Sequence, residues 1–229
     1  SLGLPQPVQF MVLDAQITLH EAQAGGDPLP APALMPYPSE LLTPLVLAPG
    51  QDAGDHLSTE PAIVTLRPAG PDDEASISDF LDRLSDHSVY LQHCNLLPQD
   101  PRQRLQRLRQ LCFLDYDRNI ALVAEWKHPL GGTSEIVALA RLNGLHGGNT
   151  ATVALVVADA LQGRGLGTAM LKTLVNFAQS RGIEHIQASL LAENTVLQGV
   201  LEHVGFDLQV AGNYITATLD LPAMAGQTG

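Results

Sequence analysis

Three glycines at alternate positions, Gly163, Gly165 and Gly167, separate an apolar, β-branched run at 153–157 from a stretch in which apolar residues recur at helical spacing. Glycine has no Cβ, so it allows tight turns and lets the backbone come close to a ligand. The first N–H groups of a helix have no partner within the helix and carry partial positive charge. A strand, a loop and a helix in this order therefore predict a binding site for a diphosphate group.

Other glycine-rich loops fit the same stretch less well. A P-loop ends in Gly-Lys-Ser/Thr, but Gly165 is followed by leucine and the next lysine is Lys172. The dinucleotide fingerprint G-x-G-x-x-G, counted from Gly163, needs a third glycine where Thr168 stands. A plain turn is the simplest alternative, although three alternating glycines exceed what a turn requires.

Residues 162–167, Gln-Gly-Arg-Gly-Leu-Gly, resemble the acyl-CoA diphosphate loop of the GNAT N-acetyltransferases, whose usual pattern is Gln/Arg-x-x-Gly-x-Gly/Ala. Downstream, Asn194 and the run Glu-His-Val-Gly-Phe at 202–206 are similar to the second signature of that family, an asparagine that opens a helix ending in Gly-Phe. The resemblance implies an α/β GNAT fold, with a mixed central sheet of about six or seven strands flanked by about four helices. It also implies acetyl-CoA, or another acyl-CoA, as co-substrate and no metal.

In GNAT enzymes the central strand splays from its neighbour, and its backbone binds the pantetheine arm and polarises the thioester carbonyl. By this resemblance, the strand before the glycine loop lies along the acyl-CoA arm, and the loop holds the diphosphate. Asn194 either contacts the pantetheine or diphosphate from the other side or caps the helix that it opens. The cofactor-binding residues implied in this way are Leu155, Val156, Val157, Gln162, Gly163, Arg164, Gly165, Leu166, Gly167, Thr168 and Asn194.

The catalytic base is where the sequence departs from the family. Protein-acetylating relatives commonly carry a glutamate on the central strand, and an alignment without gaps puts Thr152 at that position. A threonine hydroxyl is no general base near neutral pH, so the base comes from elsewhere, a water relay starts at Thr152, or the acceptor arrives deprotonated. Leu201 stands where many GNAT enzymes have a tyrosine acid. The candidate bases, each of which also reads as a surface or capping residue, are Glu135, Glu125, Asp159, Glu193 and His203.

The chain has 229 residues, of which 45% are hydrophobic, enough for one good-sized core. Its 24 Asp and Glu against 12 Lys and Arg give a formal net charge of −12, which argues against nucleic-acid or anionic-membrane partners and favours a cationic or neutral acceptor. Two cysteines, Cys94 and Cys112, lack metal-ligand spacing and favour buried thiols in a reducing compartment. Because no apolar run has membrane length and no signal-peptide pattern is present, we expect a soluble, cytoplasmic protein, and the oligomeric state stays open.

Residues 1–61 differ in composition from the rest and are expected to form an N-terminal extension and linker, rich in Pro and Gly. Residues 12–17 resemble the closing strand of the ATP-grasp part of NDP-forming acyl-CoA synthetases, and residues 35–41 resemble the linker that joins that part to a GNAT domain. We therefore expect the chain to be the C-terminal piece of a synthetase-like/GNAT fusion, related to the bacterial protein-lysine acetyltransferases. The GNAT domain is predicted at 62–221 and a disordered tail at 222–229.

Hydrophobic periodicity and turn residues outline the elements of that domain. Helices are predicted from 71 or 72 to 84, over 101–112, in the residues that directly follow the glycine loop, and over 194–204. Strands are predicted at 63–67, 119–126, 135–142, 153–157, 186–191, 207–210 and 214–219. The second, third and fourth strands should form an antiparallel meander, because glycine-containing turns join them.

The resemblance favours an acetyl-CoA-dependent N-acetyltransferase that acts on a lysine side chain of a protein, such as a metabolic enzyme of the acyl-CoA synthetase type. Two alternatives stay open. The missing glutamate and tyrosine suit a catalytically weak acyl-CoA-binding module that senses the cofactor within a larger synthetase-like protein. Acetylation of a small amine keeps the enzyme class and changes the acceptor.

Overall fold

The computed structural model describes residues 37–49, 62–91, 106, 108, 109, 111, 112, 116, 119–127, 134–145 and 149–222. The ATP-grasp-like segment at 12–17 and the tail from 223 onward lie outside the described residues, as does most of the helix predicted for 101–112.

A mixed sheet of eight strands, in the order β1-β2-β3-β4-β5-β6-β8-β7, forms the centre of the described region. All neighbouring strands are antiparallel except β5 and β6, which are parallel, and the predicted meander is confirmed as β3, β4 and β5. The strands are β1 (Thr43–Leu47), β2 (Ala62–Pro68), β3 (Asn119–Lys127), β4 (Ser134–Gly144), β5 (Thr150–Val157), β6 (His185–Leu191), β7 (Asp207–Ala211) and β8 (Tyr214–Asp220).

The strand count is higher than the six or seven expected, because β1 comes from the segment predicted to be linker. β1 has only five residues and contains Pro44, which cannot donate a ladder hydrogen bond. A proline is tolerated at the edge of a sheet, and among the described strands β1 is an edge strand that pairs with β2 alone. The sequence signal of such a strand is weak for the same reasons.

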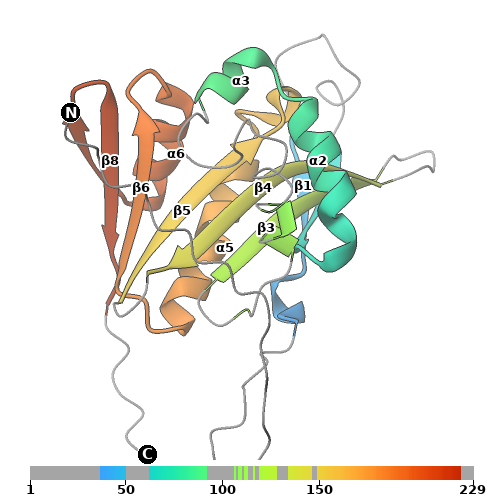
Figure 1. Ribbon diagram of the computed structural model, residues 1–229, viewed down its shortest axis with the longest axis horizontal. Helices are drawn as coiled ribbons and strands as arrows, with labels where there is room; N and C mark the ends of the chain where they lie inside the picture. The colour runs from blue at the N-terminus through green and yellow to red at the C-terminus, as the bar shows by residue number, and fades with distance from the viewer. Residues whose placement is uncertain are drawn as a thin grey trace, which may run out of the picture. The chain divides into compact units, whose positions relative to one another are not determined.

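Helices cover both faces of the sheet (Figure 1). On one face α5 and α6 add Met170, Leu174 and Leu201 to the larger hydrophobic core, and on the other face α2 adds Ile77 and Phe80 to a second core. None of the described helices combines the length and apolar character that crossing a bilayer requires. The helices are α2 (Glu74–Asp82), α3 (Asp86–Leu91), α5 (Leu166–Ser180) and α6 (Thr195–Val204), with 3-10 turns η1 (Ser39–Leu41), η2 (Pro71–Asp73) and η3 (Asp159–Leu161).

The helix predicted up to residue 84 is shorter than expected, and the next helix, α3, was not predicted. Six residues are too few for a helical pattern of apolar residues to emerge. The one local signal is Ser85, whose hydroxyl accepts a hydrogen bond of 3.2 Å from the backbone N–H of Ser88, as an N-cap does. α3 crosses the end of the sheet where β5 and β6 stand apart (Figure 1).

An ion-pair cluster fixes η2 and the start of α2 to the sheet. Arg67 on β2 donates two hydrogen bonds of 2.7 Å to the carboxylate of Asp73 and one of 2.8 Å to Glu125 on β3. Burial raises the pKa of both carboxyls, but the hydrogen bonds and positive charge of Arg67, together with smaller contributions from neighbouring groups, outweigh it, so the pKa of each is lowered. The cluster is therefore ionised at neutral pH and holds two elements together.

β5 and β6 diverge, and this feature positions the site. Their register runs only from Thr150 opposite His185 to Thr152 opposite Gln187, although both strands continue for several residues beyond. Figure 1 shows the two strands converging at one end and spreading apart at the other. The splayed central strand implied by the sequence is thus present, and Thr152 lies at the point where the strands separate.

Candidate functional site

A cleft with a volume of about 670 Å³ lies beside β5 where that strand has left β6, with walls from α3, the glycine loop, α5 and α6. Most of the residues that the sequence assigned to the cofactor meet there. Arg164 and Leu166 do not line it, and Leu166 is buried in the core. The sequence-predicted residues that line the cleft are Leu155, Val156, Val157, Gln162, Gly163, Gly165, Gly167, Thr168, Asn194 and His203.

Two of the three loop glycines have left-handed backbone conformations. The φ angles of Gly163 and Gly165 are 71° and 82°, in a region that residues with a Cβ rarely adopt. Nothing lies within 4 Å of the place where a Cβ on either residue would stand. Gly165 directly precedes α5, so this open space adjoins the unpaired N–H groups at the start of the helix. Such a cradle suits a phosphate group.

The third glycine, Gly167, allows α5 to pack closely against β5. A Cβ at Gly167 would lie 3.1 Å from Cδ2 of Leu155 and 3.7 Å from Cγ2 of Val157. α5 therefore lies directly against β5, which brings the helix N-terminus close to the strand that borders the cleft.

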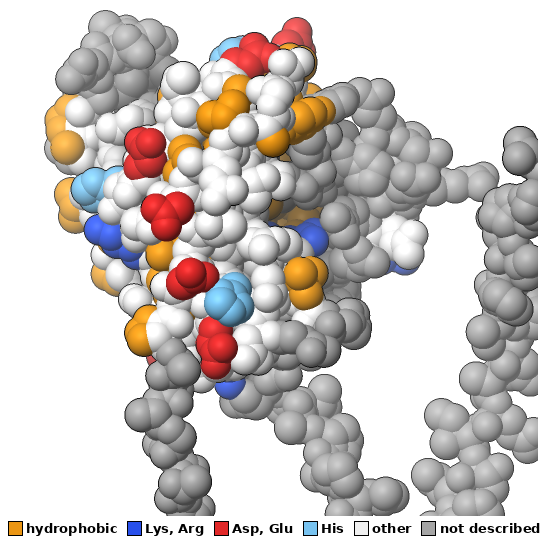
Figure 2. All heavy atoms as spheres, turned by 90° about the vertical axis from the view of Figure 1, so that its left-hand side faces the viewer, with side chains coloured by type: hydrophobic (Ala, Val, Ile, Leu, Met, Phe, Trp, Pro, Cys, Tyr) orange, Lys and Arg blue, Asp and Glu red, His pale blue; other side chains and the backbone are white. Residues whose placement is uncertain are grey.

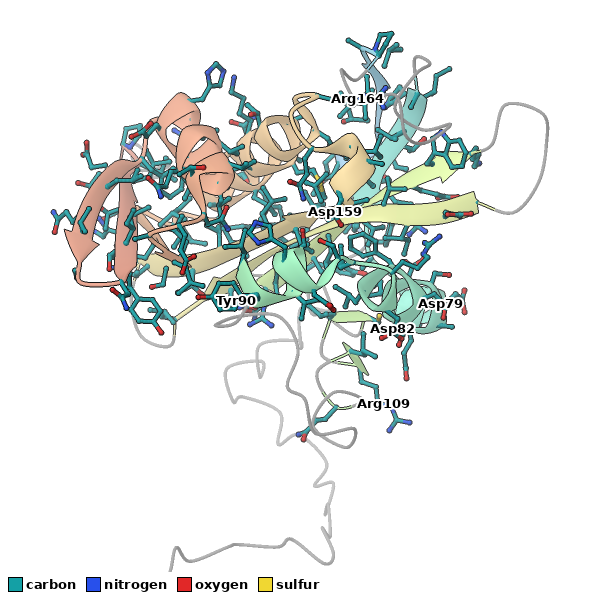
Figure 3. The ribbon with its side chains drawn as sticks, turned by 90° about the horizontal axis from the view of Figure 1, so that it is seen from above. Asp79, Asp82, Tyr90, Arg109, Asp159 and Arg164 are labelled. Atoms are coloured by element: carbon teal, nitrogen blue, oxygen red, sulfur yellow. The ribbon has the colours of Figure 1, made fainter. Side chains whose placement is uncertain are left out.

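Side chains of the glycine loop hold it in place. Arg164 donates hydrogen bonds to the backbone carbonyls of Leu47, the last residue of β1, and of Ala48, which follows it (Figure 3). Gln162 donates to the carbonyl of Val157 at 3.1 Å and to the Ser88 hydroxyl at 3.4 Å. The Arg164 guanidinium thus ties the loop to the edge of the sheet, and the loop backbone is the better candidate for phosphate contact.

Asn194 caps α6 and also lines the cleft. Its Oδ1 accepts a hydrogen bond of 3.1 Å from the N–H of Leu197, while the residue is only 6% exposed. Its side-chain NH₂ group makes no hydrogen bond within the part of the chain that the structure describes. The two roles that the sequence left open are therefore compatible, since the oxygen caps the helix and the NH₂ group is available to a ligand.

A smaller cavity continues inward from the cleft between β5 and β6. Leu91, Leu155 and Leu197 border both spaces. The inner cavity has about 20 Å³ of space for the centres of water-sized groups, enough for roughly one such group. Leu201, which stands where many GNAT enzymes have a tyrosine acid, is 1% exposed and forms part of its apolar wall.

Two of the candidate bases lie away from the cleft. Glu125 belongs to the Arg67 cluster described above. Glu135, near the start of β4, forms an exposed ion pair with Arg83, the residue that follows the end of α2. Neither residue lines the cleft or the inner cavity, so their placement favours structural roles.

Asp159 holds α3 in place. Its carboxylate accepts hydrogen bonds from the hydroxyls of Ser85, at 2.8 Å, and Ser88, at 2.7 Å, and from the Ser85 N–H at 3.1 Å. Burial raises the pKa of Asp159, but the hydrogen bonds from Ser88 and Ser85 outweigh it and the pKa is lowered. A carboxylate with a lowered pKa and three donors is a poor proton acceptor and a good anchor.

The ionisable side chains that line the cleft, among the described residues, are His87, Lys172 and His203. Of these, only His203 was among the candidate bases. Sequence reasoning missed His87 because α3 itself was not predicted. Glu193, the remaining candidate, is exposed beyond the end of β6 and accepts a hydrogen bond of 2.8 Å from the Tyr90 hydroxyl.

The sequence profile of the acetyltransferase (GNAT) family matches residues 90–206, more than half of the chain, and the match includes the cleft strand, the glycine loop, α5 and α6. The chain belongs to this family and is, by class, an N-acetyltransferase. The predicted GNAT fold is confirmed, with eight strands in place of six or seven.

Solved structures show the same fold. The GNAT domain of S. lividans PAT is 23% identical with a TM-score of 0.63, and the match covers 81% of this chain and 99% of that one. Ribosomal-protein-S5-alanine acetyltransferase from Vibrio fischeri is 16% identical with a TM-score of 0.56, covering 69% and 92%. Mycobacterium smegmatis RimJ in complex with CoA-disulfide is 22% identical with a TM-score of 0.54, covering 78% and 86%.

Proposed function

We propose that this chain transfers an acetyl group from acetyl-CoA to the side-chain amine of a lysine on a protein acceptor. The observation that carries the proposal is the cleft itself. A splayed parallel strand pair meets a helix N-terminus, and the two left-handed glycines in front of that helix leave room for a diphosphate.

The residues present fit acyl-CoA in a definite direction. The loop at Gly163 and Gly165 would hold the diphosphate, and the pantetheine arm would follow β5 backwards from Val157 to Leu155. Because a strand rises about 3.3 Å per residue, the path from Val157 to Val153 spans roughly 13 Å and ends at the inner cavity. No Asp or Glu is among the described residues that line the cleft, which suits a polyanionic ligand.

Bound acetyl-CoA would supply the acetyl group as a thioester. The acceptor nitrogen would bond to the acetyl carbon as the carbon–sulfur bond breaks and the CoA thiolate departs. The protein must position the amine and take up its proton. Among the described lining residues, His87 is the best-placed proton acceptor, because it lies one helical turn before Leu91, which borders the inner cavity. His203 lies on α6 two residues beyond Leu201, and so on a different side of that helix.

A transfer assay with acetyl-CoA and lysine-containing peptides tests the proposal. The wild-type chain should acetylate the lysine, and His87→Ala should lower kcat by about 10²-fold or more with little change in the Kd of CoA, as removal of a general base does. His203→Ala is the matched control and should retain most of the activity. Tight CoA binding without transfer to any amine would favour the acyl-CoA sensor, and transfer to small amines alone would favour the small-amine alternative.

A further inference from the structure

Tyr90 and Glu193 join the two sides of the splayed strands at the surface. Tyr90 belongs to α3, whose other end is anchored by Asp159 after β5, whereas Glu193 lies between β6 and α6. The hydrogen bond of 2.8 Å from the Tyr90 hydroxyl to Oε1 of Glu193 therefore crosses the opening between β5 and β6. Figure 3 shows Tyr90 on α3, near the ends of β6 and β8.

Tyr214 extends this group from the neighbouring strand. It is the first residue of β8 and pairs with Leu191, the last residue of β6. The N–H of Ala192 donates a hydrogen bond of 2.9 Å to the carbonyl of Asn213, which fixes the segment that carries Glu193 next to Tyr214. The Glu193 carboxylate raises the pKa of the Tyr90 hydroxyl, and Tyr214 makes a smaller contribution in the same direction, consistent with the three side chains being close.

The surface around Glu193 is exposed and largely apolar. Tyr90 is 49% exposed, Tyr214 46% and Val196 55%. Val196 also lines the cleft, so this surface leads into it. We call these four residues, Tyr90, Glu193, Val196 and Tyr214, the mouth patch.

A carboxylate next to two tyrosine rings has the chemistry that binds an ammonium group. The carboxylate supplies an ion pair and a hydrogen-bond acceptor, and the ring faces attract cations. The described lining of the cleft contains no carboxylate, and Glu193 is an exposed carboxylate directly before Asn194, which lines the cleft. The chain's formal net charge of −12 adds long-range attraction for a cation, and Figure 2 shows acidic side chains spread over one face of the molecule.

We propose that the mouth patch is the docking site for the acceptor, and that its occupant is a lysine-bearing segment of a protein with apolar residues beside the lysine. The acceptor ammonium takes the place of the Tyr90 hydroxyl on Glu193, and the apolar neighbours pack on Val196 and Tyr214. This inference rests on the proposed function, because it assigns the acceptor for that transfer.

Kinetics with two synthetic peptides test the docking site. One peptide has a single lysine between leucine and alanine residues, and the other has the same lysine between glutamates. Acetyl transfer from acetyl-CoA is measured for the wild-type chain, Glu193→Gln and Glu202→Gln, and the Kd of CoA is measured by calorimetry for each. Glu202 is the matched control because it is an exposed carboxylate on α6 outside the cleft lining.

Glu193→Gln should raise the KM of the apolar peptide about fivefold, the range expected for an exposed ion pair, with kcat and the Kd of CoA unchanged. In the wild-type chain this KM should rise with ionic strength, and the rise should be smaller in Glu193→Gln. Glu202→Gln should match the wild type, and the glutamate-flanked peptide should be the poorer substrate of the wild-type chain.

The outcomes separate the two proposals. If the wild-type chain acetylates a peptide but Glu193→Gln leaves its KM and salt dependence unchanged, the docking site is wrong and the acetyltransferase proposal stands. If the wild-type chain acetylates only small amines, the lysine-bearing occupant is wrong. If the wild-type chain binds no CoA, the proposed function itself fails.

Discussion

The Ser88 hydroxyl donates a hydrogen bond of 2.7 Å to the Asp159 carboxylate, and this contact joins α3 to the segment that leads into the glycine loop. Asp159→Asn replaces a charged acceptor of three hydrogen bonds by a neutral amide. We expect the free energy of unfolding to fall by about 1 kcal/mol, a modest value because Asp159 is exposed and water screens its interactions. Hydrogen exchange at the α3 amides should also become faster, as mass spectrometry would measure.

The control for this prediction is Asp79→Asn, an exposed carboxylate on α2 (Figure 3). Exchange at α3 should stay unchanged in that variant. Equal acceleration in both variants would mean that Asp159 does not anchor α3.

The Arg67 cluster makes stability depend on pH. The pKa of Asp73 and the pKa of Glu125 are lowered in the folded state, so their contribution is fully present above the unfolded pKa values of about 4 and is lost as the pH falls through the folded values. Asp73→Asn should lower the free energy of unfolding at pH 7 by about 2 kcal/mol, because Asp73 is largely buried and takes two hydrogen bonds from Arg67. Denaturant titration at several pH values measures both effects.

Glu135→Gln supplies the comparison for Asp73→Asn. Its ion pair with Arg83 is exposed at both partners, so its loss should cost less than about 1 kcal/mol. A larger loss for Glu135→Gln than for Asp73→Asn would contradict the account of which ion pairs hold the sheet.

The side chain of Leu201 should limit the length of the acyl group that the inner cavity accepts from acyl-CoA. Leu201→Ala enlarges the inner cavity, so we expect the ratio of kcat/KM for propionyl-CoA over acetyl-CoA to rise, together with a loss of about 2–5 kcal/mol in stability. Leu174→Ala removes an equally buried leucine that does not line the cavity. It should cost similar stability and leave the ratio unchanged. A rise in both variants would point to general loosening of the fold.

The cofactor half of the site could be predicted from the sequence because its signal is local. The strand, the glycine loop and α5 follow one another in the chain, and Gly163 and Gly165 do have the conformations that favour glycine. The hairpin of β3 and β4 likewise followed from two apolar runs joined by a glycine-containing turn.

The acceptor half could not be predicted in the same way, because it depends on contacts between distant segments. α3 is short, and its position depends on the hydrogen bond to Asp159. Tyr90 and Glu193, which form a hydrogen bond, are separated by more than a hundred residues of sequence. His87 enters the cleft only through the placement of α3. The anchoring role of Asp159 also had no sequence signal that distinguished it from a base.

The diphosphate cradle gives the sharpest test of the central claim, which is that this cleft binds acyl-CoA. Gly165→Ala puts a methyl group into the cradle and strains a φ of 82°, at a cost of about 1–2 kcal/mol in stability. Gly212→Ala introduces comparable strain, at a φ of 64°, in the turn between β7 and β8, and Gly212 does not line the cleft.

Calorimetric titration of the wild-type chain and these two variants with acetyl-CoA is the deciding measurement. The wild type and Gly212→Ala should bind with the same affinity, and Gly165→Ala should bind at least tenfold more weakly, because losing a single charge-assisted hydrogen bond to phosphate costs about 1.5–3 kcal/mol. Equal affinity in all three proteins, or no binding by the wild type, would contradict the assignment of the cleft.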